Sequence, residues 1–335
     1  MPESTHTTND TTQTTAATPA VSVIVPAYNV SRYIAEALDS VLAQTFEDYE
    51  IVVVNDGSPD TEELERVLEP YRRRIIYLKQ ENRGLSGARN TGIRAARAPF
   101  VGLLDGDDVW EPEFLSTMIG ELRRDPSVGV LYCDAIYFGD TPEAGRTFME
   151  LHPSSGEVTF ERLLAQECNV ISSVVARREL LLCAGLFDES LRSSEDFDLW
   201  LRILKAGGRI SYLRRPLMRY RRHGASLSAD PVWMCKHILR VLDKAEQTLD
   251  LTGAEGDVLR RQRRRYEAEL NFNEGKRAFF GGDTERAIAS LTKANALLPN
   301  RKVALTLRLL RVAPRALLRA YNLRDRFYFR ADTKF

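Results

Sequence analysis

The sequence has few cysteines, and their arrangement does not suggest that they stabilise the fold. The four cysteines form no CxxC pair, which argues against a zinc site or a disulfide framework and favours buried thiols in a reducing compartment. No apolar run approaches the roughly 20 residues that span a bilayer. Residues 1–20 are Thr-rich and lack the apolar segment of a secretory signal. We therefore expect a chain that is cytoplasmic, with at most a peripheral contact with a membrane.

Net charge is also lacking, but only on average. The 335 residues include 47 Lys and Arg against 47 Asp and Glu. Residues 301–335 hold ten of the basic residues and only two acidic ones, a net charge of +8. This asymmetry predicts that the C-terminal tail meets an anionic surface. No nucleic-acid motif accompanies the basic residues, so we expect no nucleic-acid partner.

Strand and helix signals alternate through the first 140 residues. We expect strands over 21–25, 51–54, 75–78, 100–104 and 128–132, separated by helices over 31–44, 60–71, 85–97 and 112–123. Continuous β-branched runs between helices predict an α/β domain with a Rossmann-like, doubly wound, mostly parallel sheet. Further helices are expected over 157–166 and 195–206 and short strands over 172–176 and 210–213, and nearly everything after 232 is expected to be helical.

Two of the expected strands end in acidic turns that contain glycine. The second strand runs into Asp56 and Gly57, and the fourth runs into Asp105, Gly106 and Asp107. Ligands of such sheets bind beyond the carboxyl ends of the strands, which places these carboxylates in a shared crevice. Carboxylate oxygens suit Mg²⁺ or Mn²⁺, which are commonly shared with substrate phosphates. An Asp-Gly turn alone is common in proteins, so the argument depends on both turns following strong strand signals.

A glycine-rich segment lies between the two turns, at residues 82–92. Its glycines and the expected helix start let backbone N–H groups face a phosphate. Arg83 and Arg89 are candidates for neutralising a pyrophosphate, because guanidinium groups match phosphate oxygens. Solvated arginines at a helix start are an equally good interpretation of this segment alone.

Four motifs in this order give the sequence its resemblance to a known family. They are Val21-Ser-Val-Ile-Val-Pro-Ala-Tyr-Asn29, Val53-Val-Asn-Asp-Gly-Ser58, Asn82-Arg-Gly-Leu-Ser-Gly-Ala-Arg-Asn90 and Leu103-Leu-Asp-Gly-Asp-Asp108. Over roughly residues 20–225 the chain resembles glycosyltransferase family 2, which has the GT-A fold. The resemblance implies that Asp56 binds the base of a nucleotide donor in a pocket lined by Pro26 and Tyr28. It also implies that Asp105 contacts the ribose and that Asp107 holds the metal on the diphosphate.

Two later segments match the same family. Ser194-Glu-Asp-Phe-Asp-Leu-Trp200 resembles its Glu-Asp motif, which implies a general base at Asp196, with Glu195 as the alternative. The alternative interpretation is a helix start, where the helix dipole favours acidic residues. Tyr220-Arg-Arg-His-Gly224 resembles a closing loop, in which His223 completes the metal or diphosphate shell and Arg222 touches the phosphates.

The C-terminal third is expected to be a helical appendage. We divide the chain into a disordered leader (1–19), a GT-A domain (20–230), a helical region (231–300) and a basic amphipathic tail (301–335). Small residues between Gly275 and Pro299 have the spacing of one tetratricopeptide-like hairpin. The hairpin is either a module for a protein partner or self-association, or a cap on the enzyme. In the tail, arginines and apolar residues fall on two separate stripes of a helix, which Pro314 is expected to interrupt. The arginine stripe holds Arg308, Arg311, Arg315 and Arg319. The apolar stripe holds Val303, Leu307, Leu310, Leu317 and Tyr321. Such a surface suits the anionic inner face of a membrane.

The resemblance implies an inverting glycosyltransferase that requires Mn²⁺ or Mg²⁺. Its donor would be a nucleoside-diphosphate sugar, with UDP favoured. Its acceptor would be a hydroxyl on a glycan or lipid-linked acceptor, in cell-surface polysaccharide or glycoconjugate synthesis. One alternative is a nucleotide-sugar nucleotidyltransferase, but a Gly-rich basic signature is missing from the first strand, where Pro26-Ala-Tyr-Asn29 stands instead. The other is a non-catalytic scaffold that acts through its helical region. The presence of all four expected site aspartates argues against lost catalysis; these are Asp56, Asp105, Asp107 and Asp196.

Overall fold

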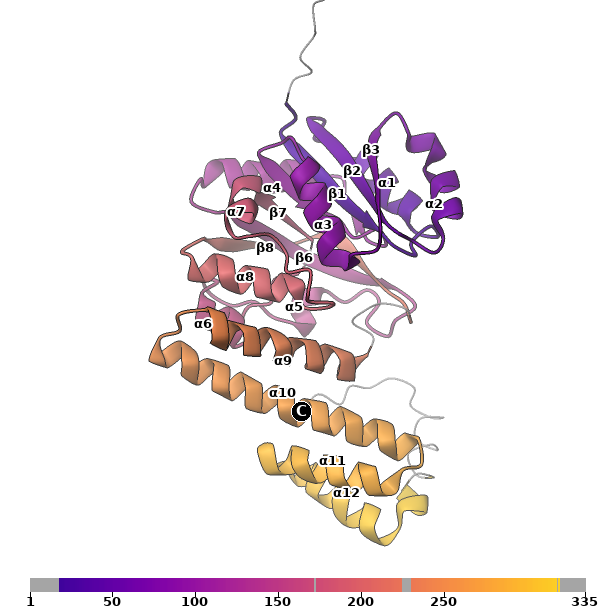
Figure 1. Ribbon diagram of the computed structural model, residues 1–335, viewed down its shortest axis with the longest axis vertical. Helices are drawn as coiled ribbons and strands as arrows, with labels where there is room; N and C mark the ends of the chain where they lie inside the picture. Colours follow the sequence, from indigo (N-terminus) through magenta and orange to yellow (C-terminus); the bar gives the residue numbers. More distant parts are fainter. Residues whose placement is uncertain (1–17, 172, 225–229, 318, 320–335) are drawn as a thin grey trace, which may run out of the picture.

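A computed structural model describes residues 18–171, 173–224, 230–317 and 319. Its centre is an eight-stranded mixed sheet in the order β3-β2-β1-β4-β7-β6-β8-β5, followed by C-terminal helices (Figure 1). The expected α/β class and the expected helical region are therefore both present. Residues 1–17 of the leader, and residues 318 and 320–335 of the tail, lie outside the described residues.

The first half of the sheet is parallel, as the sequence predicts. Three of its strands, β2, β1 and β4, are fully or largely buried because both of their faces are covered, whereas the edge strand β3 is only half-buried. Gly92 in the third helix lets that helix approach the first strand, since a Cβ there would lie 2.3 Å from Ile24 Cγ2. The elements of this half are β1 (Val21–Ala27), α1 (Ile34–Leu42), β2 (Tyr49–Asp56), α2 (Thr61–Leu68), the 3-10 turn η1 (Glu69–Tyr71), β3 (Ile75–Gln80), α3 (Gly84–Ala95) and β4 (Phe100–Leu103).

The second half of the sheet is mixed. β6 and β8 are parallel, but β7 runs antiparallel to both β4 and β6, and β5 runs antiparallel to β8. The connection from β6 to β7 contains only two short helices, of four and five residues, and β7 then pairs antiparallel with the first residues of the ten-residue strand β6. The elements are β5 (Val109–Trp110), α4 (Phe114–Arg124), β6 (Val130–Gly139), α5 (Phe148–Leu151), α6 (Phe160–Leu164), β7 (Val174–Arg177), α7 (Arg178–Cys183), α8 (Glu195–Lys205) and β8 (Ile210–Arg222).

β8 is much longer than the strand expected over 210–213. It continues for 13 residues because its pairing with β6 survives a bulge at Cys133 and Asp134. The basic segment around Pro216 conceals this continuation in the sequence. The extension matters for the site, because it brings the residues before His223 back to the acidic turn after β4.

The C-terminal helices divide between two hydrophobic cores. α9 (Pro231–Thr248) and the first half of α10 (Gly253–Phe280) contribute Val241, Leu242 and Leu259 to the core of the sheet domain. The end of α10 packs with α11 (Thr284–Leu297) and α12 (Arg301–Val312) around Phe279 and Leu291 in a second core (Figure 1). A Cβ at Gly275 would lie 2.8 Å from Leu291, so the small residue serves this close contact.

The tetratricopeptide character of this hairpin remains a prediction, although its helices are present. The expected interruption at Pro314 is confirmed, since α12 ends at Val312 and a new helical turn begins at the proline. Within the described parts of the chain, no helix has the length and apolar character needed to cross a membrane.

Candidate active site

The carboxyl ends of β1, β2 and β4 open into one large cavity of about 840 Å³. Most residues that the sequence singled out line it, although they come from six separate segments. The segment around residue 195 at the start of α8 forms the opposite wall, and α9 contributes part of the rim. Lining residues among those expected are Pro26, Tyr28, Asp56, Arg89, Asp105, Asp107, Glu195, Asp196 and His223.

Asp56 ends β2 at one end of the cavity and is held in place by its neighbours. Its Oδ1 accepts hydrogen bonds from Gln80 Nε2 at 2.7 Å and from the backbone N–H of Arg83 at 2.8 Å. The chain then turns sharply at Gly57, whose φ is 62° and where a Cβ would lie 2.8 Å from Asn82 N. The carboxylate is thus fixed at the cavity wall by the turn that follows it.

The two arginines expected at a phosphate are both occupied by carboxylates. Arg83 forms a bidentate ion pair with Glu189 at the surface and is not among the residues lining the cavity. Arg89 is only 1% exposed, and its guanidinium donates to Asp105 Oδ1 at 2.6 Å and to Glu195 Oε1 at 2.7 Å. The structure thus does not place Arg83 at the cavity, and a pyrophosphate contact of Arg89, which lines the cavity, stays a prediction. Arg89 joins the turn after β4 to the start of α8.

The acidic turn after β4 lies against the first strand and concentrates negative charge. A Cβ at Gly106 would lie 3.0 Å from Pro26 O, so only glycine fits easily. Burial, followed by the charge of Asp105, raises the pKa of Asp107. Burial, followed by the charges of Asp107 and Asp105, raises the pKa of Asp108 well above its ordinary range. Asp108 Oδ2 is buried and has no hydrogen-bond partner among the described residues. Burial of this turn therefore disfavours the ionised forms of Asp107 and Asp108.

Asp107 and His223 meet at the cavity wall, where a divalent cation fits. Asp107 Oδ2 lies 3.1 Å from His223 Nε2. Within the described residues no group of three or more His, Cys, Asp and Glu side chains forms a site by itself. Two protein ligands are nevertheless sufficient for Mg²⁺-like ions, which usually keep waters and take substrate phosphates as the remaining ligands. Such a cation would favour the ionised forms of these carboxyls, which burial disfavours.

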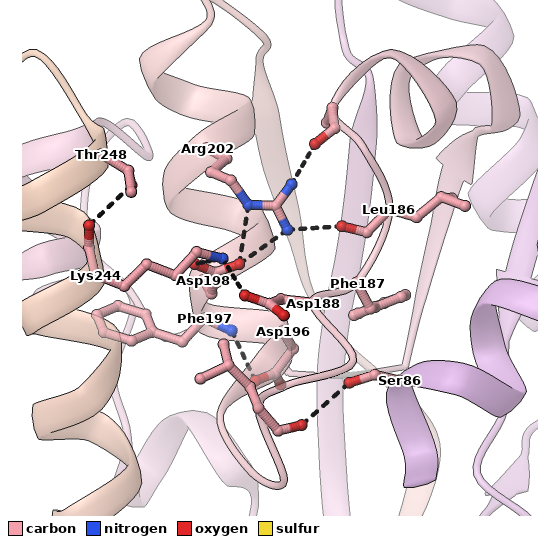
Figure 2. Close-up of polar contacts among 12 residues, drawn as sticks. Ser86, Leu186, Phe187, Asp188, Asp196, Phe197, Asp198, Arg202, Lys244 and Thr248 are labelled. Atoms are coloured by element: carbon pink, nitrogen blue, oxygen red, sulfur yellow. Dashed lines mark hydrogen bonds and ion pairs between the residues drawn. The ribbon is translucent and has the colours of Figure 1, made fainter. Parts of the chain in front are cut away.

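The start of α8 presents two carboxylates with different surroundings. Burial raises the pKa of Glu195 to about 7, against the opposing charge of Arg89. Asp196 is half-buried, and its Oδ1 accepts a hydrogen bond from Phe197 N at 2.7 Å (Figure 2). Burial also raises the pKa of Asp196. Ser194, just before them, has a φ of 58°, a strained conformation of the kind found at functional sites.

The third acid of this helix belongs to a separate ion network. Asp198 pairs with Arg202 at 2.9 Å and with Lys244 of α9 at 2.8 Å, and Lys244 also pairs with Asp188 at 2.6 Å (Figure 2). Arg202 donates to the backbone oxygen of Leu186 as well. This network fastens α9 to the sheet domain behind the two carboxylates that line the cavity.

Sequence reasoning missed several lining residues. Arg222 was expected at the phosphates, but Arg221 lines the cavity and Arg222 does not. Arg221 donates to Asp107 O at 2.7 Å, and its guanidinium lies 4.2 Å from the centroid of Phe138. Side chains alternate along a strand, so one of the two arginines had to point away. The sequence alone does not tell which. The residues from α9, namely Trp233, Met234 and Ile238, carried no motif at all.

The sequence matches the model of the family described as Glycosyl transferase family 2 over residues 22–181. A curated relative, the uncharacterized glycosyltransferase EpsJ of Bacillus subtilis, is 36% identical over 228 residues, or 64% of this chain. The chain belongs to glycosyltransferase family 2. This family 2 glycosyltransferase spans less than two thirds of the first curated relatives it matches, 64% in the case of EpsJ.

Solved structures show that the fold is shared as well. The Staphylococcus aureus TarS fragment 1–349, solved in complex with UDP-GlcNAc, has a TM-score of 0.58 at 22% identity, covering 93% of each chain. The mannosyltransferase PcManGT from Pyrobaculum calidifontis, solved with GDP-Man and Mn²⁺, has a TM-score of 0.59 at 22% identity, covering 93% of this chain and 85% of its own. At this identity the likeness concerns the GT-A fold, including the presence of C-terminal helices.

Proposed function

We propose that this family 2 glycosyltransferase transfers a sugar, with inversion, from a nucleoside-diphosphate donor to an acceptor hydroxyl. The acceptor oxygen attacks the anomeric carbon, the bond from that carbon to the diphosphate breaks, and a carboxylate takes the hydroxyl proton. The observation that carries the proposal is that Asp56, Asp105, Asp107 and Asp196 line one cavity. They stand at the strand ends and the helix start where a donor and an acceptor can meet.

The donor lies across the carboxyl ends of β1, β2 and β4 in this proposal. Its base meets Asp56 beside Pro26 and Tyr28, and its ribose meets Asp105. Asp107 and His223 would hold Mn²⁺ or Mg²⁺, which supplies neutralisation of the diphosphate as it leaves. Arg221 replaces Arg222 as the arginine at this end, because its side chain lines the cavity. UDP remains the favoured base, and the UDP-GlcNAc complex of TarS is compatible with it.

Asp196 is the better candidate for the general base than Glu195. Glu195 is 5% exposed and its Oε1 is bound by Arg89, so it is poorly placed to take a proton from an acceptor. Asp196 is more exposed to the cavity, and burial moves its pKa upward, toward the value that suits a base near neutral pH. Glu195 and Arg89 act as positioning residues, since they tie the base-bearing helix to the ribose-binding turn.

The acceptor occupies the other half of the cavity. That half is lined by apolar side chains from three helices, with Trp233 of α9 39% exposed at the rim. Aromatic rings offer a flat apolar face to sugars while their surroundings stay wet. A glycan or lipid-linked acceptor suits such a wall; its apolar residues include Phe148, Leu163, Val170, Met234 and Ile238. We place the reaction in surface polysaccharide or glycoconjugate synthesis.

The two alternatives from the sequence are weaker now. A nucleotidyltransferase is disfavoured by the family match over residues 22–181. A scaffold without activity does not explain why the buried Arg89 binds both Asp105 and Glu195 at the wall of one cavity. The helical hairpin can still bind a protein partner or a second copy in addition to the enzyme activity.

The test is release of nucleoside diphosphate by the purified full-length chain from a panel of UDP-, GDP- and dTDP-sugars with Mn²⁺ or Mg²⁺. We expect turnover of one donor class. Asp196→Asn should lower kcat by roughly 10²-fold or more while donor binding by calorimetry is unchanged. The matched control is Asp243→Asn, an exposed acid of α9 paired with Arg263, which should turn over like wild type. Normal turnover by Asp196→Asn, with Glu195→Gln inactive, would move the base by one residue.

A further inference from the structure

Helix α12 has two apolar faces, and among the described residues only one of them packs against the rest of the protein. Val303, Leu307 and Leu310 are buried in the second core against α10 and α11. This is the apolar stripe that the sequence suggested for membrane contact. It is corrected here, because a stripe that holds the helix to the hairpin cannot enter a lipid surface.

The opposite face of α12 exposes a second apolar stripe. Leu305 is 58% exposed, Leu309 43% and Val312 85%. At about 100° per residue these three positions fall within roughly 60° of one another, on the side away from Val303 and Leu307. Single exposed apolar residues are common on protein surfaces, but three large aliphatic residues grouped on one helix face are typical of an interaction site.

Basic side chains surround this stripe. Lys302, Arg308 and Arg311 of the same helix are exposed, as are Arg301 and Arg315 at its ends. The sequence has no acidic residue between Leu298 and Asn322. Among the described residues, none of these five cations has a carboxylate within ion-pair distance. The outer face of α12 therefore combines exposed aliphatic side chains with positive charge that the rest of the described chain leaves unbalanced.

We propose that the outer face of α12 docks on an anionic lipid bilayer. Aliphatic residues that enter the acyl boundary, ringed by Lys and Arg that meet headgroup phosphates, are the features of a helix lying in the membrane plane. A second copy of the chain fits less well, because a symmetric interface would place the same cations against one another. A nucleic acid fits less well too, since the stripe is aliphatic and carries no aromatic ring for stacking.

The test is co-sedimentation of the full-length chain with vesicles of phosphatidylcholine, with and without about one third phosphatidylglycerol, at about 0.1 M and 0.5 M salt. Two variants probe the two features separately: Leu305→Asn with Leu309→Asn, and Arg308→Gln with Arg311→Gln. All four positions are exposed, so the fold should survive, and thermal unfolding checks this. The matched control is Leu182→Asn, a 37% exposed leucine of α7 in the sheet domain.

We expect wild type and control to bind only the anionic vesicles, with affinity falling at least tenfold at high salt. Each double variant should bind at least tenfold more weakly at low salt. The proposal is overturned if wild type fails to bind, binds neutral vesicles equally well, or is matched by the leucine variant. Light scattering that shows a wild-type oligomer lost in the leucine variant would assign the stripe to self-association instead. Donor turnover is measured separately, so its absence would count against the proposed function and not against this docking surface.

Discussion

Replacing Arg89 by methionine probes the central link of the site. Methionine keeps much of the length of the side chain but removes its charge and its hydrogen bonds. Arg89 is 1% exposed and bridges Asp105 and Glu195, whose side chains are 23% and 6% exposed. Breaking a buried pair by removing one partner costs about 3–5 kcal/mol. Because Asp105 can be rehydrated, we count the pair with Glu195 alone. At about 2–4 °C per kcal/mol, Tm should fall by about 6–20 °C.

The destabilisation of Arg89→Met should depend on pH, and its sign follows from Glu195. Burial raises the pKa of this group in the folded protein from 4.5 to about 7. A raised carboxyl pKa contributes stability that is full below pH 4.5 and is lost as pH rises through about 7. Arg89 limits that loss by pairing with the ionised form. The variant lacks this compensation, so its deficit against wild type should be small near pH 5 and large near pH 9.

Thermal unfolding of the full-length chain from about pH 5 to 9 measures this deficit. The matched control is Arg209→Met, whose pair with Asp125 is about half exposed on both sides and should be worth at most about 1 kcal/mol at every pH. Adding Glu195→Gln to Arg89→Met should recover part of the loss at high pH, because the orphaned charge is removed. The reasoning is refuted if Arg89→Met is no worse than Arg209→Met, or if its deficit is the same at pH 5 and pH 9.

Two further predictions concern the ligands. Asp107→Asn should raise the Mn²⁺ or Mg²⁺ concentration needed for half-maximal turnover by about tenfold or more, since one of two protein ligands loses its charge; an unchanged metal titration after EDTA treatment would remove Asp107 from the metal site. Trp233→Ala should raise the acceptor KM by about tenfold and leave slow donor hydrolysis unchanged; an unchanged acceptor KM, compared with the exposed control Leu182→Asn, would place the acceptor elsewhere.

The parts of the site that sequence reasoning located are those fixed by strand ends. Asp56 ends a β-branched run, Asp105 and Asp107 follow the apolar strand Phe100–Leu103, and parallel strands bring such ends to one edge. The direction of β7 and the length of β8 were not accessible in this way. The direction of β7 depends on where the connection after β6 brings the chain back to the sheet, and the length of β8 depends on a bulge that lets pairing continue past Cys133.

The partners of the arginines were also beyond the sequence. Arg89 and Glu195 are 106 positions apart, and nothing local links them. Residues 86–90 of α3 are all buried in the structure, and nothing in the sequence shows this burial. Arg83, three positions before this run, reaches the surface and pairs with Glu189. The same motif thus contains one buried and one exposed arginine.

The two hydrophobic cores decide how the helical region relates to the enzyme. α9 shares the core of the sheet domain, supplies Trp233 to the cavity rim and is fastened by Lys244 to Asp188 and Asp198. A cut at residue 230 would therefore remove part of the cavity together with its support. The second core depends on α12, whose Val303 and Leu307 cover the hairpin. A cut at residue 300 would expose that core, and any lost membrane contact could then reflect unfolding of the hairpin. Point substitutions on the outer face of α12 separate these effects, because they leave both cores intact.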